Sequence, residues 1–413
     1  MKRVVVTGMG IWSCIGQDLQ TVTESLKQGR SGIIFDPKRI EYGLHSGLVG
    51  NVHRPDLKPL LPRKFRATMS EDAEYAYMAA RQAFDQAEIN DEYLHHNEVG
   101  VIFGNDANVH LHDYISLMEE EHDSMMIGPN AHFQSETSSV TMNLGTIFHL
   151  RGINFCVGAA CASGSHAIGL AAMLIRQGLQ ETILAGGSCT VDMRSAIITD
   201  AIEAISRHNN TPQGASRPFD RERDGMIPSG GAAALVLEEY EHAIARGATI
   251  LAEVIGYGFS SNGLEDISVP SADGEYIAMK RALDDAGLHP SEIDYVNAHA
   301  TSTIAGDIEE AKALTRLFGK SQITNHKSPM ISSTKSMTGH ENWMAGASEA
   351  VYSILMMQNN FVAPNINLEN VIDEAKDLNI ARETIYTPIN TVLSNSSGMG
   401  GTNSALVFRK IKD

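Results

Sequence analysis

Short apolar runs that end in glycine alternate along the chain with longer segments of helical periodicity. The runs that predict buried strands are Val4–Gly8, Val99–Gly104, Thr182–Gly187, Ala232–Leu237 and Thr391–Asn395. The Ala-rich run at 232–237 fits a helix equally well. Helical patterns cover Glu74–Ala87, Ser165–Gln177, Tyr276–Ala286 and Ile308–Phe318. This alternation predicts an α/β fold in which helices cover a sheet.

A weak internal repeat runs through this pattern. Val6–Gly10 resembles Val254–Gly258, and Ala83–Ala87 resembles Ala282–Ala286. Such short matches also arise by chance, so duplication is one of two open interpretations. If the chain is duplicated, the boundary falls near Gly247, which divides it into residues 1–246 and 247–413.

Composition narrows the classes of partner. The 413 residues carry a formal net charge of −18, which argues against general affinity for nucleic acid or for an anionic membrane. Four cysteines are too few for a disulfide scaffold of this size, so we expect a cytoplasmic protein. No apolar run approaches the roughly 20 residues of a membrane span. The 36 glycines predict many tight turns or close backbone approaches.

The first candidate for chemistry is Cys161. An apolar run enters at Asn154, small residues make a turn around Cys161, and a helical pattern follows. At a helix N-terminus, unpaired N–H groups and the helix dipole favour a thiolate. A free cysteine that is simply a small buried hydrophobe is the equally open alternative.

Two histidines and a lysine lie in similar turns. His299 ends an apolar run, and Lys335 and His340 share a turn of small residues. A hydrogen-bonded core histidine is the plainer interpretation of either one taken alone. Residues 394–403 form a glycine-dense loop that either presents N–H groups to an oxyanion or makes a wide turn.

Metal chemistry is not predicted. The segment starting at His340 begins like an HExxH zinc motif, but Met344 stands where the second histidine is required. The chain also contains no CxxC pair.

Taken together, these segments resemble a known family. VGAACASGSHAIG around Cys161, VNAHATST around His299, STKSMTGH at 333–340 and GMGGTN at 398–403 resemble the β-ketoacyl-acyl carrier protein synthases of the thiolase superfamily. More specifically, they resemble the chain-elongating Cys-His-His subgroup. The resemblance extends over essentially the whole chain and includes SRPFDRERDG at 216–225.

The resemblance implies a fold and partners. The fold is thiolase-like, with two pseudo-duplicated halves in an α-β-α-β-α arrangement. Such proteins are usually homodimers, and a heterodimer with a chain-length factor is the alternative. No cofactor is expected, because the substrates are carried on the phosphopantetheine of acyl carrier protein.

The resemblance also implies roles. The expected reaction is a decarboxylative Claisen condensation of an acyl chain on Cys161 with malonyl-acyl carrier protein, in fatty-acid or specialised polyene or polyketide synthesis. His299 and His340 stabilise the enolate, and Lys335 orients the site with Glu310 as its partner. Thr301, Thr303, Met399 and Gly400 would contact the substrate arm, and the N–H groups of Cys161 and Met399 would form the oxyanion hole.

Several positions depart from the family pattern. Ala300 replaces a glycine, and Ser397 and Met399 replace two phenylalanines of the glycine loop. Gly104–Asn108 is more polar than the usual glycine-rich loop, and Glu341–Trp343 replaces small apolar residues. These changes raise the hypothesis of an unusual acyl substrate, which stands beside ordinary fatty-acid elongation.

Carrier docking requires basic residues, because acyl carrier proteins are acidic. Arg63, Lys64 and Arg66 match one basic patch of the family. The acidic run Met118–Asp123 replaces the other, and like charges slow association. Solvated surface charge outside the footprint is the alternative interpretation of that run.

Two other classes remain to be distinguished. A non-catalytic chain-length factor lacks the reactive cysteine, whereas this chain retains Cys161. A thiolase would carry a second catalytic cysteine near the C-terminal glycine loop, and residues 394–403 contain none.

Overall fold

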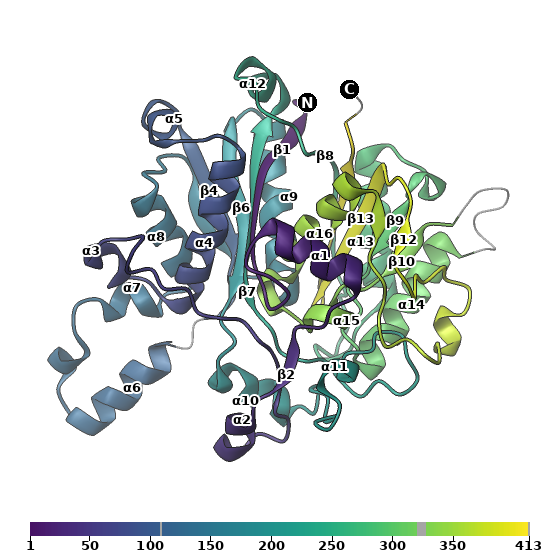
Figure 1. The fold of residues 1–413 in the computed structure, drawn as a ribbon, viewed down its shortest axis with the longest axis horizontal. Coiled ribbons are helices and arrows are strands. Elements are labelled where there is room, and N and C mark those ends of the chain that lie inside the picture. Colours follow the sequence, from purple (N-terminus) through teal and green to yellow (C-terminus); the bar gives the residue numbers. More distant parts are fainter. Residues whose placement is uncertain (108–109, 320–327, 412–413) are drawn as a thin grey trace.

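The strands of the two predicted halves lie in one mixed sheet. The computed structural model describes residues 1–107, 110–319 and 328–411. Within this part, ten strands follow the order β10-β9-β13-β14-β8-β1-β7-β6-β4-β5 (Figure 1). Their bounds are β1 Val4–Trp12, β4 Val99–Gly104, β5 Asn154–Val157, β6 Thr182–Cys189, β7 Gly231–Glu239, β8 Ala252–Ser261, β9 Tyr295–Asn297, β10 Met330–Ser332, β13 Thr391–Gly398 and β14 Thr402–Arg409.

The sheet consists of two equivalent five-stranded halves. Read outward from the centre, β1-β7-β6-β4-β5 corresponds to β8-β14-β13-β9-β10. The halves join where β1 pairs with β8 through only two residue pairs, Val5 with Glu253 and Val6 with Ala252. In each half the two pairings nearest the centre are antiparallel and the two outer pairings are parallel.

Helices form three further layers around the two halves (Figure 1). The outer layers are α4 (Glu71–Gln86) with α8 (Ser139–Ile147), and α13 (Ala272–Ala286) with α14 (Ile304–Phe318). The middle layer is α9 (Ser163–Arg176) and α16 (Ala345–Asn359), which pack on each other and on strands of both halves. Three large buried apolar clusters fill the spaces between these layers. The predicted α-β-α-β-α arrangement is therefore confirmed.

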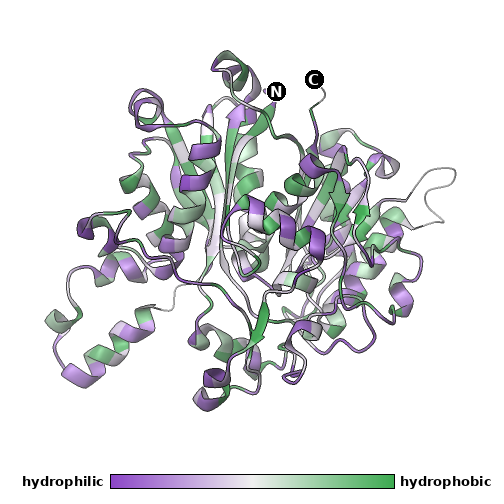
Figure 2. Ribbon diagram, in the orientation of Figure 1, coloured by the Kyte–Doolittle hydropathy of each residue, from purple (hydrophilic) through white to green (hydrophobic). Residues whose placement is uncertain are grey.

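Smaller elements cover the periphery, where Figure 2 shows mainly hydrophilic residues on helices such as α5 and α12. None of the described helices combines the length and apolarity needed to cross a membrane. The remaining elements are α1 Leu19–Gln28, β2 Ile33–Phe35, α2 Pro37–Tyr42, β3 Leu48–Gly50, α3 Arg63–Arg66, α5 Asp91–His96, α6 His110–Glu121, α7 Ala131–Ser135, α10 Met193–Ala201, α11 Pro212–Ala215, α12 Tyr240–Ala245, α15 Lys335–Thr338, β11 Phe361–Val362 and β12 Ile385–Tyr386. All four residues of α15 are buried.

The internal repeat has a packing basis. A Cβ added to Gly8 on β1 would stand 2.0 Å from the carbonyl oxygen of Ala83 on α4. A Cβ added to Gly256 on β8 would stand 2.2 Å from the carbonyl oxygen of Ala282 on α13. In both halves glycine lets the first strand approach its covering helix closely. This equivalent packing confirms the duplication.

Where the elements differ from expectation, the reason is local. The Ala-rich run is strand β7, whose residues are buried along its whole length between two other strands. Helices α4 and α13 begin a few residues before the predicted starts, because Ser70 and Ser271 accept N–H hydrogen bonds as N-caps.

Candidate active site

The starts of the two middle helices bring the first two predicted residues together. Cys161 lies in the 3₁₀ turn Ala160–Ala162 that leads into α9, and His340 precedes the turn Asn342–Met344 that leads into α16. Because α9 packs on α16, the two turns meet. The Nε2 atom of His340 lies 2.9 Å from the Sγ atom of Cys161.

His299 completes the group at the end of β9. Its ring centroid lies 5.3 Å from that of His340, and the two rings are perpendicular. Burial, assisted by the positive charge of Lys335, holds the pKa of both histidines well below the ordinary value. Both imidazoles are therefore neutral and available as hydrogen-bond donors or acceptors.

The protonation of Cys161 differs from the sequence-based expectation. We expected the helix N-terminus to favour a thiolate, but burial raises the pKa of the thiol to about 11. The Met399 N–H and the charge of Lys335 act in the opposite direction and are outweighed. Cys161 is thus a neutral thiol at rest, beside an imidazole that can accept its proton.

Lys335 has a different partner from the one expected. Its ammonium group forms an ion pair with Glu349 of α16 rather than with Glu310, and both side chains are 1% exposed. Glu310 of α14 instead accepts hydrogen bonds from the backbone N–H groups of His299 (2.7 Å) and Ala300. Glu310 therefore positions the backbone that carries His299.

A clamp holds the loop after His299. The hydroxyls of Thr301 and Thr303 lie 3.0 Å apart at the start of α14. Arg223 donates from Nε to the carbonyl oxygen of Thr303 at 3.0 Å, and Asp307 accepts the Ser302 N–H at 3.1 Å. The SRPFDRERDG segment, which sequence reasoning matched without assigning a role, supplies Arg223 to this clamp.

The glycine-dense loop is the hairpin between β13 and β14. Its Gly398 packs so closely on the turn that carries Cys161 that a Cβ on Gly398 would stand 2.7 Å from the carbonyl oxygen of Ala159. Gly400 follows with φ of 89°, a conformation that favours glycine. Met399 is 57% exposed. The hairpin thus presents the Met399 N–H to Cys161 and leaves the Met399 side chain exposed to solvent.

Two buried acids near this centre were not predicted to have a structural role. Glu349 stands in an otherwise apolar, small-residue helix, a pattern that signals a buried charge with a partner. Glu341 follows His340 and is 1% exposed. It accepts hydrogen bonds from the hydroxyls of Ser13 and Tyr352, each at 2.9 Å, and from Ser348.

Burial raises the pKa of Glu341 from 4.5 to about 7, which predicts a pH-dependent stability. The folded state holds the proton more tightly than the unfolded state, so this contribution is largest below pH 4.5 and is lost as pH rises through about 7. We expect Glu341→Gln to reduce the decline in unfolding free energy between pH 5 and 8 by up to about 3 kcal/mol. Urea unfolding across that range measures it, with exposed Glu92→Gln as the control. Equal pH dependence in Glu341→Gln and the wild type would contradict the prediction.

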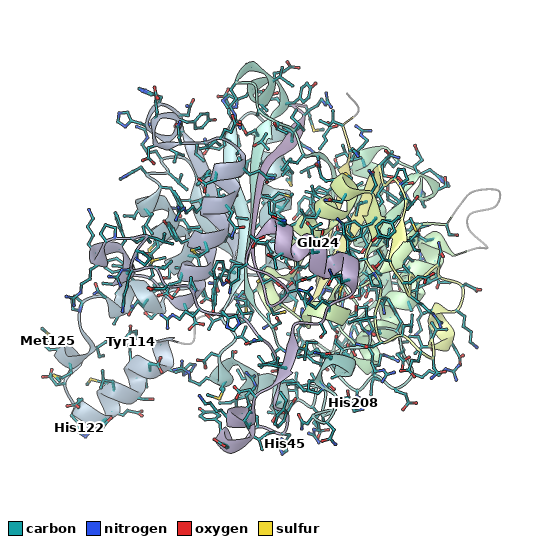
Figure 3. All side chains as sticks on the ribbon, in the orientation of Figure 1. Glu24, His45, Tyr114, His122, Met125 and His208 are labelled. Atoms are coloured by element: carbon teal, nitrogen blue, oxygen red, sulfur yellow. The ribbon has the colours of Figure 1, made fainter. Side chains whose placement is uncertain are left out.

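Other predicted residues lie outside this centre. Arg63, Lys64 and Arg66 form α3 at the periphery of the N-terminal half (Figure 1). The acidic run Met118–Asp123 ends α6, and Figure 3 places His122 at the outer tip of that segment. Asn108 of the polar loop lies outside the described residues. Among the residues described, no group of three or more metal-ligating side chains occurs.

Comparisons with known proteins agree with this geometry. The β-ketoacyl synthase N-terminal domain matches residues 1–243, and the C-terminal domain matches residues 251–369. The chain is 40% identical to 3-oxoacyl-[acyl-carrier-protein] synthase 1 of Escherichia coli over 100% of both chains. A β-ketoacyl synthase from Burkholderia phymatum covers 100% of both chains at 36% identity, with a TM-score of 0.93. The ishigamide ketosynthase/chain length factor matches at 28% identity, also over 100% of both chains, with a TM-score of 0.88.

Proposed function

The chain belongs to the β-ketoacyl synthase family, and we propose that Cys161, His299, His340 and Lys335 form its catalytic centre. The enzyme condenses an acyl chain with malonyl-acyl carrier protein and releases a 3-oxoacyl chain two carbons longer. The contact between Cys161 Sγ and His340 Nε2 carries this assignment, because it places a nucleophile and a proton acceptor within hydrogen-bond distance.

Acyl transfer is the first half-reaction. Sγ of Cys161 attacks the thioester carbon, and His340 Nε2 accepts the thiol proton. The N–H groups of Cys161 and Met399 bind the oxyanion that forms. The bond to the pantetheine sulfur breaks, and this sulfur leaves with the proton from His340.

Decarboxylation begins the second half-reaction. The bond between the malonyl carboxylate and the α-carbon breaks, CO₂ leaves, and the electron pair moves to the thioester oxygen. Neutral His299 donates an N–H hydrogen bond to that oxygen, and neutral His340 does the same once its proton has moved from Nδ1 to Nε2, the nitrogen that faces Cys161. Two donors stabilise the enolate more completely than one, which fits the two adjacent rings.

Condensation completes the cycle. The enolate carbon attacks the acyl carbon on Cys161, a carbon–carbon bond forms, and the bond to Sγ breaks. The sulfur leaves as a thiolate and takes one proton from water, which restores the resting thiol. Thr301 and Thr303 hold the pantetheine arm, Gly400 leaves space for it, and Glu310 keeps His299 in place.

The function is tested by intact-protein mass spectrometry after incubation with a panel of acyl carriers. A mass increase equal to one acyl group, followed by product formation with malonyl carrier, is the expected result. Failure of every acyl group to label the protein would contradict the proposal. The panel also distinguishes ordinary fatty-acid elongation from use of a specialised acyl substrate. Efficient elongation of saturated medium chains would exclude a specialised substrate.

We further propose that acyl carrier protein docks on α3. Arg63 and Lys64 are exposed, which suits an acidic partner. Reversing both charges should slow carrier-dependent turnover by about tenfold, with a weaker effect at high salt. The Arg63 and Lys64 variant should turn over free pantetheine thioesters at the wild-type rate. A control variant with the charges of Lys58 and Arg81 reversed should keep its carrier-dependent turnover. Unaltered carrier-dependent turnover would show that α3 is not the docking site.

Assembly and location follow the same reasoning. We propose that the protein is a cytoplasmic homodimer. We also propose that each chain consists of two halves, residues 1–246 and 247–413. A heterodimer with a chain-length factor is the alternative, and native mass spectrometry after co-expression separates the two. The substrates carry their own phosphopantetheine, so the proposed reaction uses no cofactor bound to this chain.

A further inference from the structure

Asp106 lies beside the nucleophile and has no role in the mechanism above. It belongs to the polar loop that follows β4. Its Oδ2 atom accepts a hydrogen bond from the backbone N–H of Ala160 at 3.2 Å. Ala160 has φ of 46°, an uncommon left-handed conformation for a residue other than glycine, and it directly precedes Cys161. Asp106 therefore holds Ala160, the strained residue directly before Cys161, in place.

The second carboxylate oxygen remains available. Asp106 is exposed, and its Oδ1 atom stands 2.5 Å from where a Cβ on Gly158 would lie, so only glycine there leaves it room. The charged groups that act on the sulfur come from opposite halves of the chain. Asp106 disfavours additional negative charge at Cys161, whereas Lys335 of the C-terminal half favours it.

The two substrates of the proposed reaction differ mainly in charge. Both arrive as thioesters on the same arm, but the malonyl group ends in a carboxylate. If malonyl were transferred to Cys161, it would occupy the position that the growing chain requires. A fixed carboxylate beside the sulfur repels that group while leaving an uncharged acyl chain unaffected.

We propose that Asp106 is a specificity-determining residue that excludes anionic acyl groups from Cys161. The malonyl group then supplies the enolate that attacks the acyl chain, and it is not itself transferred to Cys161. This inference rests on the proposed function, since it assigns a selection between that reaction's two substrates. The hydrogen bond to Ala160 adds a second, positioning role, which substitution can separate from the charge.

Two variants distinguish charge from position. Asp106→Asn removes the charge and keeps an oxygen that can accept the Ala160 N–H, whereas Asp106→Ala removes both. We expect Asp106→Asn to accept malonyl at least about tenfold faster than the wild type and to accept a neutral acyl group at the same rate. Asp106→Ala should also accept malonyl but lose rate with both groups. Asp85→Asn, an exposed acid on α4, is the control that leaves both rates unchanged.

The experiment compares malonyl and acetoacetyl pantetheine thioesters, which are similar in size and differ in charge. Labelling of the full-length enzyme is followed by intact-protein mass spectrometry, counting malonyl and its decarboxylated acetyl product together. The inference would be overturned if the ratio of the malonyl labelling rate to the acetoacetyl labelling rate were the same in Asp106→Asn and in the wild type. Absence of labelling by any neutral thioester in the wild type would instead overturn the proposed function.

A second measurement does not depend on the folding of a variant. Repulsion between charges is screened by salt, so exclusion of malonyl by the wild-type enzyme should weaken as ionic strength rises, while acetoacetyl transfer should not change. In folded Asp106→Asn, alkylation of Cys161 by iodoacetamide should shift to lower pH because a nearby negative charge is lost. A charge role for Asp106 would be contradicted if the rate of malonyl transfer to the wild type did not change with salt and the pH dependence of Cys161 alkylation were the same in Asp106→Asn and the wild type.

Discussion

Replacing Cys161 with alanine is expected to abolish acyl transfer and condensation. The reaction requires a covalent thioester, and within the described part of the chain the side-chain hydrogen bond of His340 is made to Cys161. The condensation rate should fall by about a thousandfold or more. Intact-protein mass spectrometry after incubation with acyl carrier should show no added acyl group.

The same variant separates the two half-reactions. Decarboxylation of malonyl carrier depends on His299 and His340 and not on the sulfur, so Cys161→Ala should still release CO₂ without forming a longer chain. Cys156→Ala is the matched control, because Cys156 lies in β5 with its sulfur directed to the carbonyl oxygen of Thr137. Retained acylation in Cys161→Ala, or its loss in Cys156→Ala, would place the nucleophile elsewhere.

Replacing Lys335 with methionine is expected to cause the largest loss of stability. Lys335 and Glu349 form a buried ion pair, and removing one partner leaves an uncompensated buried group. Breaking such a pair costs about 3–5 kcal/mol of unfolding free energy. Condensation should also slow, because the charge of Lys335 adds to the effect of burial in keeping the pKa of both histidines low.

Guanidinium unfolding at pH 7 measures the loss, with secondary structure followed by circular dichroism. The double variant Lys335→Met, Glu349→Leu is the control for the pair, because it removes both charged groups and should recover part of the stability. An unfolding free energy for Lys335→Met equal to that of the wild type would show that the pair contributes no net stability. If the double variant recovered unfolding free energy but not condensation activity, the role of Lys335 in stability would be separated from its role in the reaction.

Much of the fold could be predicted because its signals are local. Continuous apolar runs mark buried strands, and β4 has the predicted bounds Val99–Gly104. The repeated glycines of β1 and β8 appear in the sequence as a weak repeat, since close packing on a helix excludes a side chain at those positions. Helix starts were missed where the cap lies outside the apolar pattern, as at Ser70 and Ser271.

The site was less evenly predictable. Cys161, His299 and His340 stand in small-residue turns that carry a family pattern, so their assembly could be expected. The partner of Lys335 could not, because Glu349 reaches it through the packing of α16 and no local spacing encodes that contact. The protonation of Cys161 also escaped prediction, because burial acts against the helix N-terminus and depends on every element around the sulfur.

The sequence by itself therefore determined the family and the duplicated α/β layering, and it supplied the residues that we propose as the catalytic groups. It could do so because those properties depend on periodicity and on residues that are adjacent along the chain. Only the tertiary structure decided that His340 contacts Cys161, that Glu349 pairs with Lys335, and that Asp106 holds the turn before the nucleophile. These contacts join residues that are 179, 14 and 54 positions apart in the sequence, and their energies arise from burial and charge that exist only once the chain has folded.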